Sequence, residues 1–369
     1  MTDPLRVLVI GAAANVWQFH APALDAIGAR VVAAFDPNRS GARRIASERG
    51  CALADDIDDL LAHDADLAVI LAPHVHHPDL TLAALDSGCH VLVEKPMAVT
   101  IGDAERMVAA AERTGKLLAV AVQQRTRHEV LAAKRLIDAG DLGELRRIDL
   151  LATWPRRTSY FETAPWRATW SGEGGGILMN QGQHDLDLLC WLAGPPATLV
   201  ATTSNVMHGR EVEDTAVALL HWRNGATGAL RISSAERDER QRIEITGTRG
   251  RIRLTPGRLE VERSALDFRE YAAADGNPYA APAATAPEVV DGGGGTHVEL
   301  YRNLAGALNG EEALIAPGAD AAAAVELANA IVTSAQLRKE VDLPIEREHY
   351  ARLLEELQHR HALSSITDA

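Results

Sequence analysis

A loop near the start of the chain has residue types that suit the binding of a phosphate group. An apolar run at residues 5–10 ends at Gly11 and precedes a segment predicted to be helical. Backbone amides and a helix N-terminus attract an anion at such a position, as they do in folds that bind dinucleotides. The usual Gly-x-Gly-x-x-Gly spacing is incomplete, because Ala13 and Val16 replace its second and third glycines. The loop, which also contains Asn15, predicts a pyrophosphate site of altered shape.

An acidic residue ends the second apolar run of the chain. Residues 30–35 lead into Asp36, which lies 25 residues after Gly11. A carboxylate at this strand end can accept both ribose hydroxyls of adenosine and repels a 2′-phosphate, so it favours NAD over NADP. Arg39 is close enough in sequence to pair with that phosphate, which keeps NADP as a second option. The alternative is that Asp36 caps a turn formed with Pro37 and Asn38.

Alternating strand and helix patterns must position these two sites. Short apolar runs of the kind that form strands buried on both faces lie at residues 5–10, 30–35, 67–71, 91–93 and 117–122. Helix-length segments at residues 39–49, 78–87 and 101–114 end before Gly50, Gly88 and Gly115. The pattern predicts an α/β fold that begins with a Rossmann domain, a doubly wound parallel sheet over residues 1–125.

The pattern changes in residues 126–369, which we assign to a second domain. A helix at 129–139 and a strand at 147–154 precede strands at 198–206, 215–222, 227–233, 242–246 and 251–254. Turn signals without intervening helices, such as Asn224-Gly225, predict an α+β domain with a largely antiparallel open sheet. Residues 272–295 predict a loop. Helices are predicted again at 297–306 and, with Asp320 as the N-cap, at 321–338.

The composition excludes several classes of protein. Arg and Lys number 37 against 51 Asp and Glu, and a net charge of -14 argues against a nucleic acid or an anionic membrane as partner. No apolar stretch reaches the length of about 18 residues that a membrane span needs. The widely spaced Cys51, Cys89 and Cys190 form neither a disulfide framework nor a zinc site, so we expect a cytoplasmic protein.

Three motifs resemble those of the glucose–fructose oxidoreductase/inositol dehydrogenase (Gfo/Idh/MocA) family. Residues 72–77, Ala-Pro-His-Val-His-His, are similar to its Thr-Pro-Asn-x-x-His loop, and Glu94-Lys95-Pro96 matches its Glu-Lys-Pro signature. Residues 174–187 resemble its Gly-Gly-Gly…Asp-x-x-x-His-x-x-Asp segment, with Asn180 where many members carry Asp. The resemblance extends from residue 5 to about residue 344, and the combination of the last two signatures is specific.

The resemblance implies an NAD(P)-dependent sugar or polyol dehydrogenase that acts on a pyranose or a cyclitol. Its first domain would hold the cofactor, and its second domain would cover the substrate. The open sheet of the second domain would make the contacts of a homodimer or homotetramer. The resemblance also implies cofactor contacts from the motif loops and the strand end that follows, at Ala72, Pro73, His74, His77, Glu94, Lys95 and Gln123.

Oxidation of a secondary alcohol removes a hydride and a proton from one H–C–O–H unit. The nicotinamide takes the hydride, so the protein must orient the carbon and accept the hydroxyl proton. Of His184 and Lys95, His184 is the better base, because a free imidazole titrates near pH ~6.5. Lys95, one of only four lysines, would stabilise the alkoxide or relay the proton at a strand end. The alternatives are a surface salt bridge between Lys95 and Glu94 and a helix-face His184 bonded to backbone.

Asn180 departs from the family pattern at a position four residues before His184. An amide can hydrogen-bond the imidazole or a sugar hydroxyl but cannot act as an acid or a base. Either His184 works without a carboxylate partner, or the oxidation acts on a different hydroxyl geometry. We predict that Asn180 is an orienting or substrate residue, while Asp187 is a substrate contact or a structural cap.

Aromatic and basic residues suit the recognition of a sugar ring. Five of the 15 aromatic residues fall within 17 residues, from Trp154 to Trp170. Apolar faces of a sugar pack on aromatic rings, and its hydroxyls need hydrogen-bond partners. The alternative is that the aromatic residues build a core or an interface. The candidate substrate contacts are Arg125, Tyr160, Trp166, Arg167, Trp170 and His297, and Arg156 and Arg157 could bind hydroxyls or a carboxylate.

The histidines at positions 74, 76 and 77 superficially suggest a metal site. No cysteine or carboxylate follows at ligand spacing, and the family resemblance implies metal-free hydride transfer, so we predict no metal. We expect His77 near the nicotinamide loop.

Two other functions compete with a dehydrogenase. One is redox-neutral, NAD-assisted glycoside cleavage, in which a transient ketone acidifies a neighbouring C–H; cofactor that stays bound without net reduction would favour it. The other is a non-catalytic dinucleotide sensor, suggested by the incomplete glycine motif and Asn180. Growth of the NADH absorbance band with any polyol would exclude the sensor.

Overall fold

The computed structural model describes residues 3–237 and 240–367, the last seven of them by their backbone alone, and divides them into two compact units. The first unit comprises the chain up to Thr126 with two later segments, Ser171–Gly174 and Gly295–Val325. The second comprises Arg127–Trp170, Gly175–Gly294 and the chain from Glu326 onward. Both later segments of the first unit lie within the range that the sequence assigned to the second domain.

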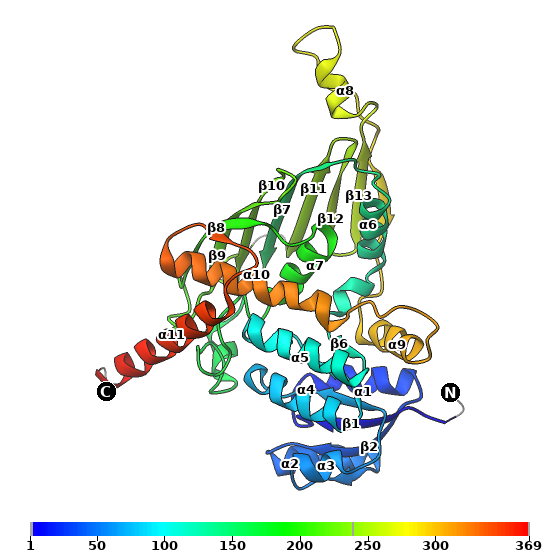
Figure 1. Cartoon of the computed structure of the whole chain (residues 1–369), viewed down its shortest axis with the longest axis vertical. Helices are drawn as coiled ribbons and strands as arrows, with labels where there is room; N and C mark the ends of the chain where they lie inside the picture. Colours follow the sequence, from blue (N-terminus) through cyan, green and yellow to red (C-terminus); the bar gives the residue numbers. More distant parts are fainter. Residues whose placement is uncertain (1–2, 238–239, 368–369) are drawn as a thin grey trace. The chain divides into compact units, whose positions relative to one another are not determined.

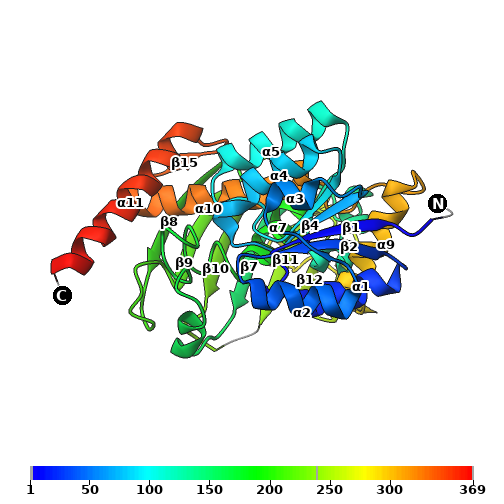
Figure 2. The ribbon, with the colours of Figure 1, turned by 90° about the horizontal axis from the view of Figure 1, so that it is seen from below.

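The first unit is built on a six-stranded parallel sheet of order β3-β2-β1-β4-β5-β6. Its central strands carry Val, Ile, Leu and Ala that are buried on both faces, because helices cover both sides of the sheet. Figure 2 shows α4 and α5 on one side of this sheet and α1 and α2 on the other. The predicted doubly wound parallel sheet is therefore confirmed. The strands are β1 (Arg6–Ile10), β2 (Arg30–Phe35), β3 (Ala52–Leu53), β4 (Leu67–Ile70), β5 (His90–Val93) and β6 (Leu118–Val120).

Helices of the first unit end where the sequence predicts. Gly50 and Gly115 follow α2 and α5 in the left-handed conformation, with φ of 60° and 65°, which glycine adopts without strain. The helices are α1 (Trp17–Ala26), α2 (Arg39–Arg49), α3 (Ile57–Leu61), α4 (His77–Asp86), α5 (Ile101–Thr114) and α9 (His297–Leu308), with 3-10 turns at His74–His76 and Gln123–Thr126.

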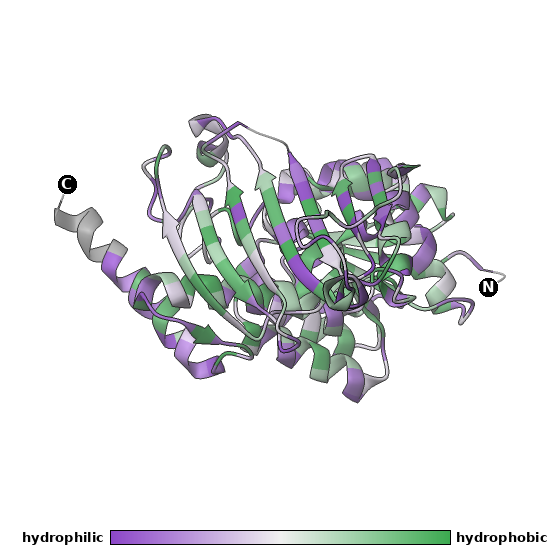
Figure 3. Ribbon diagram, turned by 90° about the horizontal axis from the view of Figure 1, so that it is seen from above, coloured by the Kyte–Doolittle hydropathy of each residue, from purple (hydrophilic) through white to green (hydrophobic). Residues whose placement is uncertain are grey.

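The second unit is built on a nine-stranded sheet of order β14-β13-β12-β11-β7-β10-β9-β8-β15. All neighbours are antiparallel except β7 and β10, which confirms the largely antiparallel sheet. Alternate residues face the core and solvent, and Figure 3 shows the alternation along the strands. The strands are β7 (Leu145–Thr153), β8 (Thr198–Ser204), β9 (Thr215–His221), β10 (Thr227–Ser233), β11 (Gln241–Gly247), β12 (Gly250–Thr255), β13 (Arg258–Arg263), β14 (Glu288–Asp291) and β15 (Val341–Asp342).

Helices α6 and α7 lie against one face of the nine-stranded sheet (Figure 1). A projecting arm between β13 and β14 carries α8, and α11 runs toward the C-terminus (Figure 1). The helices are α6 (His128–Asp138), α7 (Gln183–Ala193), α8 (Phe268–Ala273) and α11 (Arg347–Thr367), with a 3-10 turn at Thr158–Glu162; α10 (Gly318–Leu337) gives residues to both units.

Two local predictions are wrong. Residues 272–295 are not entirely a loop, because β14 pairs with β13 within them; four residues at a sheet edge are too few to show a strand pattern. Asp320 is not an N-cap, since α10 begins at Gly318 and Asp320 lies in its first turn, where a carboxylate still favours the positive end of the helix.

Candidate active site

The Gly11 loop makes a tight turn after β1, and the N–H groups of residues 11 to 14 are hydrogen-bonded within the protein. Gly11 has φ of 82°, and a Cβ atom on it would lie 2.7 Å from the backbone of Leu71 and Ala72, so only glycine fits. Ala13 replaces the second glycine and packs on Gly41 of α2, where an added Cβ would lie 2.4 Å from the Ala13 Cβ. The missing side chain at Gly41 therefore makes room for the methyl group at Ala13.

Asp36 binds the same loop. Its Oδ2 atom accepts the Ala13 N–H at 2.9 Å, and its Oδ1 atom accepts the Asn38 N–H at 2.7 Å. The carboxylate thus caps a turn, as the alternative reading expects, and it also ties the end of β2 to the Gly11 loop. Arg39 is held by protein groups, since its guanidinium bonds the Ala54 carbonyl and lies 2.6 Å from Asp55.

His77 joins the loops that follow β4 and β5. The side chain is fully buried, with Nδ1 2.8 Å from the Pro96 carbonyl and Nε2 2.7 Å from the Ala72 carbonyl. Burial lowers the pKa of His77, although both carbonyls act in the opposite direction. The imidazole therefore fixes the loop that carries Pro73 and His74 against the Glu-Lys-Pro segment.

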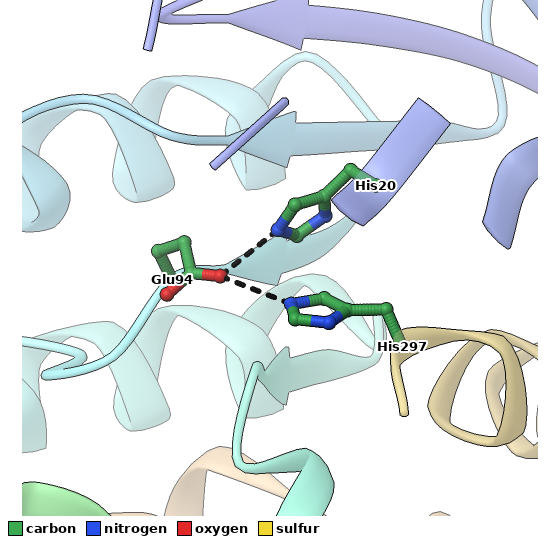
Figure 4. A group of neighbouring side chains, drawn as sticks. All are labelled: His20, Glu94 and His297. Carbon is green, nitrogen blue, oxygen red and sulfur yellow. Dashed lines mark hydrogen bonds and ion pairs between the residues drawn. The ribbon is translucent and has the colours of Figure 1, made fainter. Parts of the chain in front are cut away.

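Glu94 lies at the end of β5 between two imidazoles (Figure 4). Its Oε1 atom lies 2.9 Å from His20 Nε2 and 3.6 Å from His297 Nε2, while Oε2 accepts the N–H of Lys95 at 3.1 Å. Burial alone would raise the pKa of Glu94, but the two imidazoles outweigh it and hold the pKa well below the ordinary range. A buried carboxylate thus anchors the backbone at Lys95, and the predicted substrate residue His297 lies beside it. One oxygen of Glu94 and one nitrogen each of His20 and His297 lie within 4.8 Å of one another, close enough to hold a metal ion. The sequence analysis considered other histidines, at positions 74, 76 and 77, and predicted no metal.

The strand ends of the first unit suit a ligand with phosphate, ribose and amide groups. The Gly11 loop brings its backbone close to the strand ends without a side chain at Gly11, and Asp36 offers a carboxylate. The Oε1 atom of Gln123 is buried and has no hydrogen-bond partner among the described residues, so it can accept a donor from a ligand. Arg125 is buried instead against the protein, with Nη1 3.0 Å from the Ile315 carbonyl and 3.6 Å from Asp320.

The second unit gathers several predicted substrate residues around one hydroxyl group. The Tyr160 oxygen lies 2.8 Å from Arg167 Nη1, 3.2 Å from Asn180 Nδ2 and 3.0 Å from Gln181 Nε2. The Arg167 guanidinium stacks on the ring of Trp166. Trp170 instead belongs to the core, because it is 3% exposed and its Nε1 donates to the Glu211 carbonyl at 3.0 Å.

The glycines before α7 fit around a buried carboxylate. Glu213 accepts the N–H of Gly176 at 3.0 Å and that of Leu178 at 3.1 Å, and a Cβ on Gly176 would lie 1.8 Å from the Glu213 carbonyl oxygen. This turn delivers the chain to Asn180 and to α7, on which His184 is half-buried. Asp187 is buried on the same helix.

Asp185 is a buried acid that the sequence analysis missed. It accepts the Trp154 Nε1–H at 2.6 Å and a hydrogen bond from Gln241. Burial raises the pKa of Asp185 to about 6, although both hydrogen bonds lower it. The only signal in the sequence is its position next to His184, which does not reveal burial. His20 and Glu213 were missed for the same reason, since their partners lie 74 and 37 residues away.

Comparisons with known proteins identify both parts of the chain. Residues 5–122 match the model described as "Oxidoreductase family, NAD-binding Rossmann fold", and residues 130–253 match "GFO/IDH/MocA C-terminal domain". The resemblance inferred from the motifs and the NAD-binding fold are therefore confirmed. Among the described residues, no helix combines the length and the apolar character needed to cross a bilayer.

Individual relatives act on hydroxylated six-membered rings, by their names. A 1-carboxy-3-chloro-3,4-dihydroxycyclohexa-1,5-diene dehydrogenase of Comamonas testosteroni is 34% identical, matching 55% of this chain and 51% of its own. A D-glucoside 3-dehydrogenase of Escherichia coli is 32% identical over 53% and 56%. This chain thus spans about half the length of these curated relatives. The WlbA dehydrogenase from Bordetella pertussis, solved with NADH and UDP-GlcNAcA, has a TM-score of 0.80 and 27% identity, over 93% of this chain and 100% of that one.

Proposed function

Because this chain belongs to the Gfo/Idh/MocA family of NAD-binding oxidoreductases, we propose that it oxidises a secondary hydroxyl of a pyranose sugar or a cyclitol. One observation carries the proposal: Lys95 lies two residues after the end of β5, in the same parallel sheet whose β1 leads into the Gly11 loop. Ligands of open α/β sheets bind at the carboxyl ends of the strands. The Lys95 cation and the Gly11 loop therefore lie at the edge of the sheet where a cofactor and an alcohol would react together.

The first unit is proposed as the cofactor domain. Asp36 would accept the adenosine ribose hydroxyls and so favour NAD over NADP, since its charge repels a 2′-phosphate. When bound, NAD supplies the hydride acceptor. The residues that would hold it are Gly11, Ala13, Asn15, Val16, Asp36, Ala72, Pro73, His74, His77, Glu94, Lys95 and Gln123; Arg39, already paired with Asp55, is a weaker candidate.

Lys95 and His184 are proposed to handle the hydroxyl proton. The imidazole of His184 would accept it, and the Lys95 ammonium would stabilise the developing alkoxide. Asn180 is proposed to orient the substrate or the imidazole, because its amide can do both but carries no charge. Its hydrogen bond to Tyr160 supports a fixed side chain at that position.

The substrate class rests on the relatives and on the second unit. The three relatives are named for, or were solved with, molecules that contain a hydroxylated six-membered ring or a sugar. Tyr160, Arg167 and Asn180 come together in the second unit and offer polar groups that can hydrogen-bond the hydroxyls of a sugar.

We further propose that the nine-stranded sheet forms the contact of a homodimer or homotetramer. Val200 of β8 and Leu219 of β9 are direct partners in the sheet and are 44% and 58% exposed, which leaves an apolar patch on the surface. Light scattering should show an oligomer, and Leu219→Lys should shift it toward the monomer.

The test of the proposed function is an absorbance assay at the NADH band. The full chain is incubated with NAD and, in turn, D-glucose, D-glucuronate, D-glucose 6-phosphate and scyllo-inositol. The proposal expects NADH to accumulate with at least one ring. If the protein binds NAD but reduces no NAD with any of these compounds, the proposed function is contradicted and a sensor is favoured. Cleavage of a methyl glycoside without net NADH would favour the redox-neutral reaction.

A further inference from the structure

Guanidinium groups and aromatic rings alternate along one part of the second unit. The Cζ atom of Arg240 lies 4.6 Å from the ring centroid of Trp154, and that of Arg156 lies 5.9 Å from Trp154 and 5.1 Å from Tyr160. The Cζ atom of Arg167 lies 4.7 Å from the Tyr160 centroid and 4.6 Å from that of Trp166. We call this set the arginine ladder: Arg240, Trp154, Arg156, Tyr160, Arg167 and Trp166.

Two of the three rings of the ladder are fixed by hydrogen bonds at their edges. Trp154 donates its Nε1–H to the buried Asp185, and the Tyr160 oxygen contacts the side-chain amides of Asn180 and Gln181. Because cation–π contact holds a guanidinium over a ring face, fixed rings also restrict where the guanidinium groups lie. The ladder therefore presents preorganised cations, which reduces the entropy lost when a ligand binds.

The charge of one ladder arginine, Arg156, is not compensated by an ion pair within the described part of the chain. Arg156 has no carboxylate within 4.0 Å among the residues that the structure describes; its Nη1 donates to the Pro155 carbonyl at 3.1 Å. The nearby Glu162 pairs with Arg210 instead, at 3.6 Å. Asp185, buried at the edge of Trp154, interacts electrostatically with Arg127 and Arg240 and forms no ion pair with Arg156. In a chain of net charge -14, the ladder gathers three arginines in one place.

The ladder adjoins the proposed substrate residues. Tyr160, its central ring, contacts Asn180, which lies four residues before His184 at the start of α7. A guanidinium fork matches the paired oxygens of a carboxylate or a phosphate, and an arginine on a ring face keeps N–H donors at its edge. An acidic protein also repels an anionic substrate, so it needs a local positive site to bind one.

We propose that the arginine ladder binds an oxyanion, a carboxylate or a phosphate, carried by the ring substrate, so that the protein acts on acidic ring polyols in preference to neutral ones. This inference rests on the proposed function for the reaction, and on the ladder alone for the binding of the anion.

The experiment compares matched probes on the full chain with NAD: D-glucose, D-glucuronate and D-glucose 6-phosphate. The kcat/KM ratio of an acidic probe to D-glucose should be about tenfold or more, and Arg156→Gln should reduce this ratio about tenfold. Preference for D-glucuronate alone identifies a carboxylate, and preference for D-glucose 6-phosphate alone identifies a phosphate. Arg251→Gln, which removes an exposed arginine paired with Glu262 at 2.9 Å, is the matched control and should leave the ratio unchanged.

Calorimetric titration of both acidic probes into the NAD-saturated protein gives a readout that does not depend on turnover. Equal kcat/KM for all three probes, or an equal loss for all three in Arg156→Gln, would contradict the proposal while the dehydrogenase remained. Binding that depends on Arg156 without oxidation would support the anion site and contradict the proposed reaction. If an acidic probe is neither bound nor oxidised, the anion site is contradicted. Oxidation of D-glucose would then decide separately whether the protein is a dehydrogenase.

Discussion

The Nε2 atom of His20 lies 2.9 Å from the Oε1 atom of Glu94, and both side chains are buried in the first unit. Burial lowers the pKa of His20, so the neutral ring donates from Nε2 to the carboxylate and accepts the Tyr301 hydroxyl at Nδ1, 2.8 Å away. Helix α1, which follows the Gly11 loop, is thereby tied to the residue that precedes Lys95.

This contact predicts a loss of stability in mild acid. The pKa of His20 is lowered by burial from its ordinary 6.5, so the unfolded chain binds more protons than the folded chain below that pH. Stability should therefore fall as the pH drops below 6.5, and His20→Gln should make this fall smaller. Urea unfolding at pH 8.0, 6.5 and 5.5 measures both effects. His221→Gln, at an exposed position, provides the control, and an unchanged pH dependence in His20→Gln would contradict the assignment.

Asp185 predicts a pH dependence of opposite sign. Its pKa is raised by burial from 3.8 to about 6, so the folded chain holds a proton that the unfolded chain has lost. Stability should decrease as the pH rises through this range, by about 1–2 kcal/mol between pH 5 and pH 8. Asp185→Asn should remove that component from urea unfolding curves, whereas Asp275→Asn, at an exposed position, should not. Identical curves for Asp185→Asn and the parent chain would show that Asp185 does not titrate as described.

Asp36 predicts which cofactor the protein prefers. Asp36→Ser removes the charge that repels a 2′-phosphate, so the ratio of NADP to NAD affinity should rise about tenfold or more. Titration of each cofactor against protein fluorescence measures this ratio without turnover. Asp55→Ser is a useful second variant, because it frees Arg39 from its 2.6 Å ion pair and should raise NADP affinity alone. A ratio unchanged in Asp36→Ser would mean that its carboxylate only caps the loop.

Lys95 predicts a separation of binding from turnover. Lys95→Ala should retain NAD binding but lose a hundredfold to ten-thousandfold in kcat, because the ammonium is proposed to act on the alkoxide. Lys339→Ala, at an exposed position, is the control. Undiminished turnover in Lys95→Ala would refute the proposed role, while lost NAD binding would assign Lys95 to the cofactor alone.

Local sequence signals predicted the framework of the fold. Continuous Val, Ile, Leu and Ala runs identified β1, β2 and β4, because strands buried on both faces need apolar residues at every position. Gly50 and Gly115 marked helix ends through the left-handed backbone that they allow. These signals depend on neighbouring residues only, so they can be read from the chain itself.

Contacts over long sequence separations were not predictable. The guanidinium of Arg125, which was predicted to touch substrate, contacts Ile315, 190 residues away. The substitution of Ala13 for glycine makes structural sense only beside Gly41, since the missing side chain lies on another element. Burial of Asp185 likewise depends on Trp154 and Gln241, whose strands reach it only in the folded second unit.

The most direct test follows the hydrogen that leaves the ring. The full chain is incubated with NAD and with D-glucose, D-glucuronate or scyllo-inositol deuterated at the ring carbons, and the cofactor is analysed by mass spectrometry. The account predicts that, with at least one of these rings, the reduced cofactor carries one deuterium taken from the oxidised carbon. Reduced cofactor without deuterium, or no reduced cofactor with any of the three rings, would contradict it.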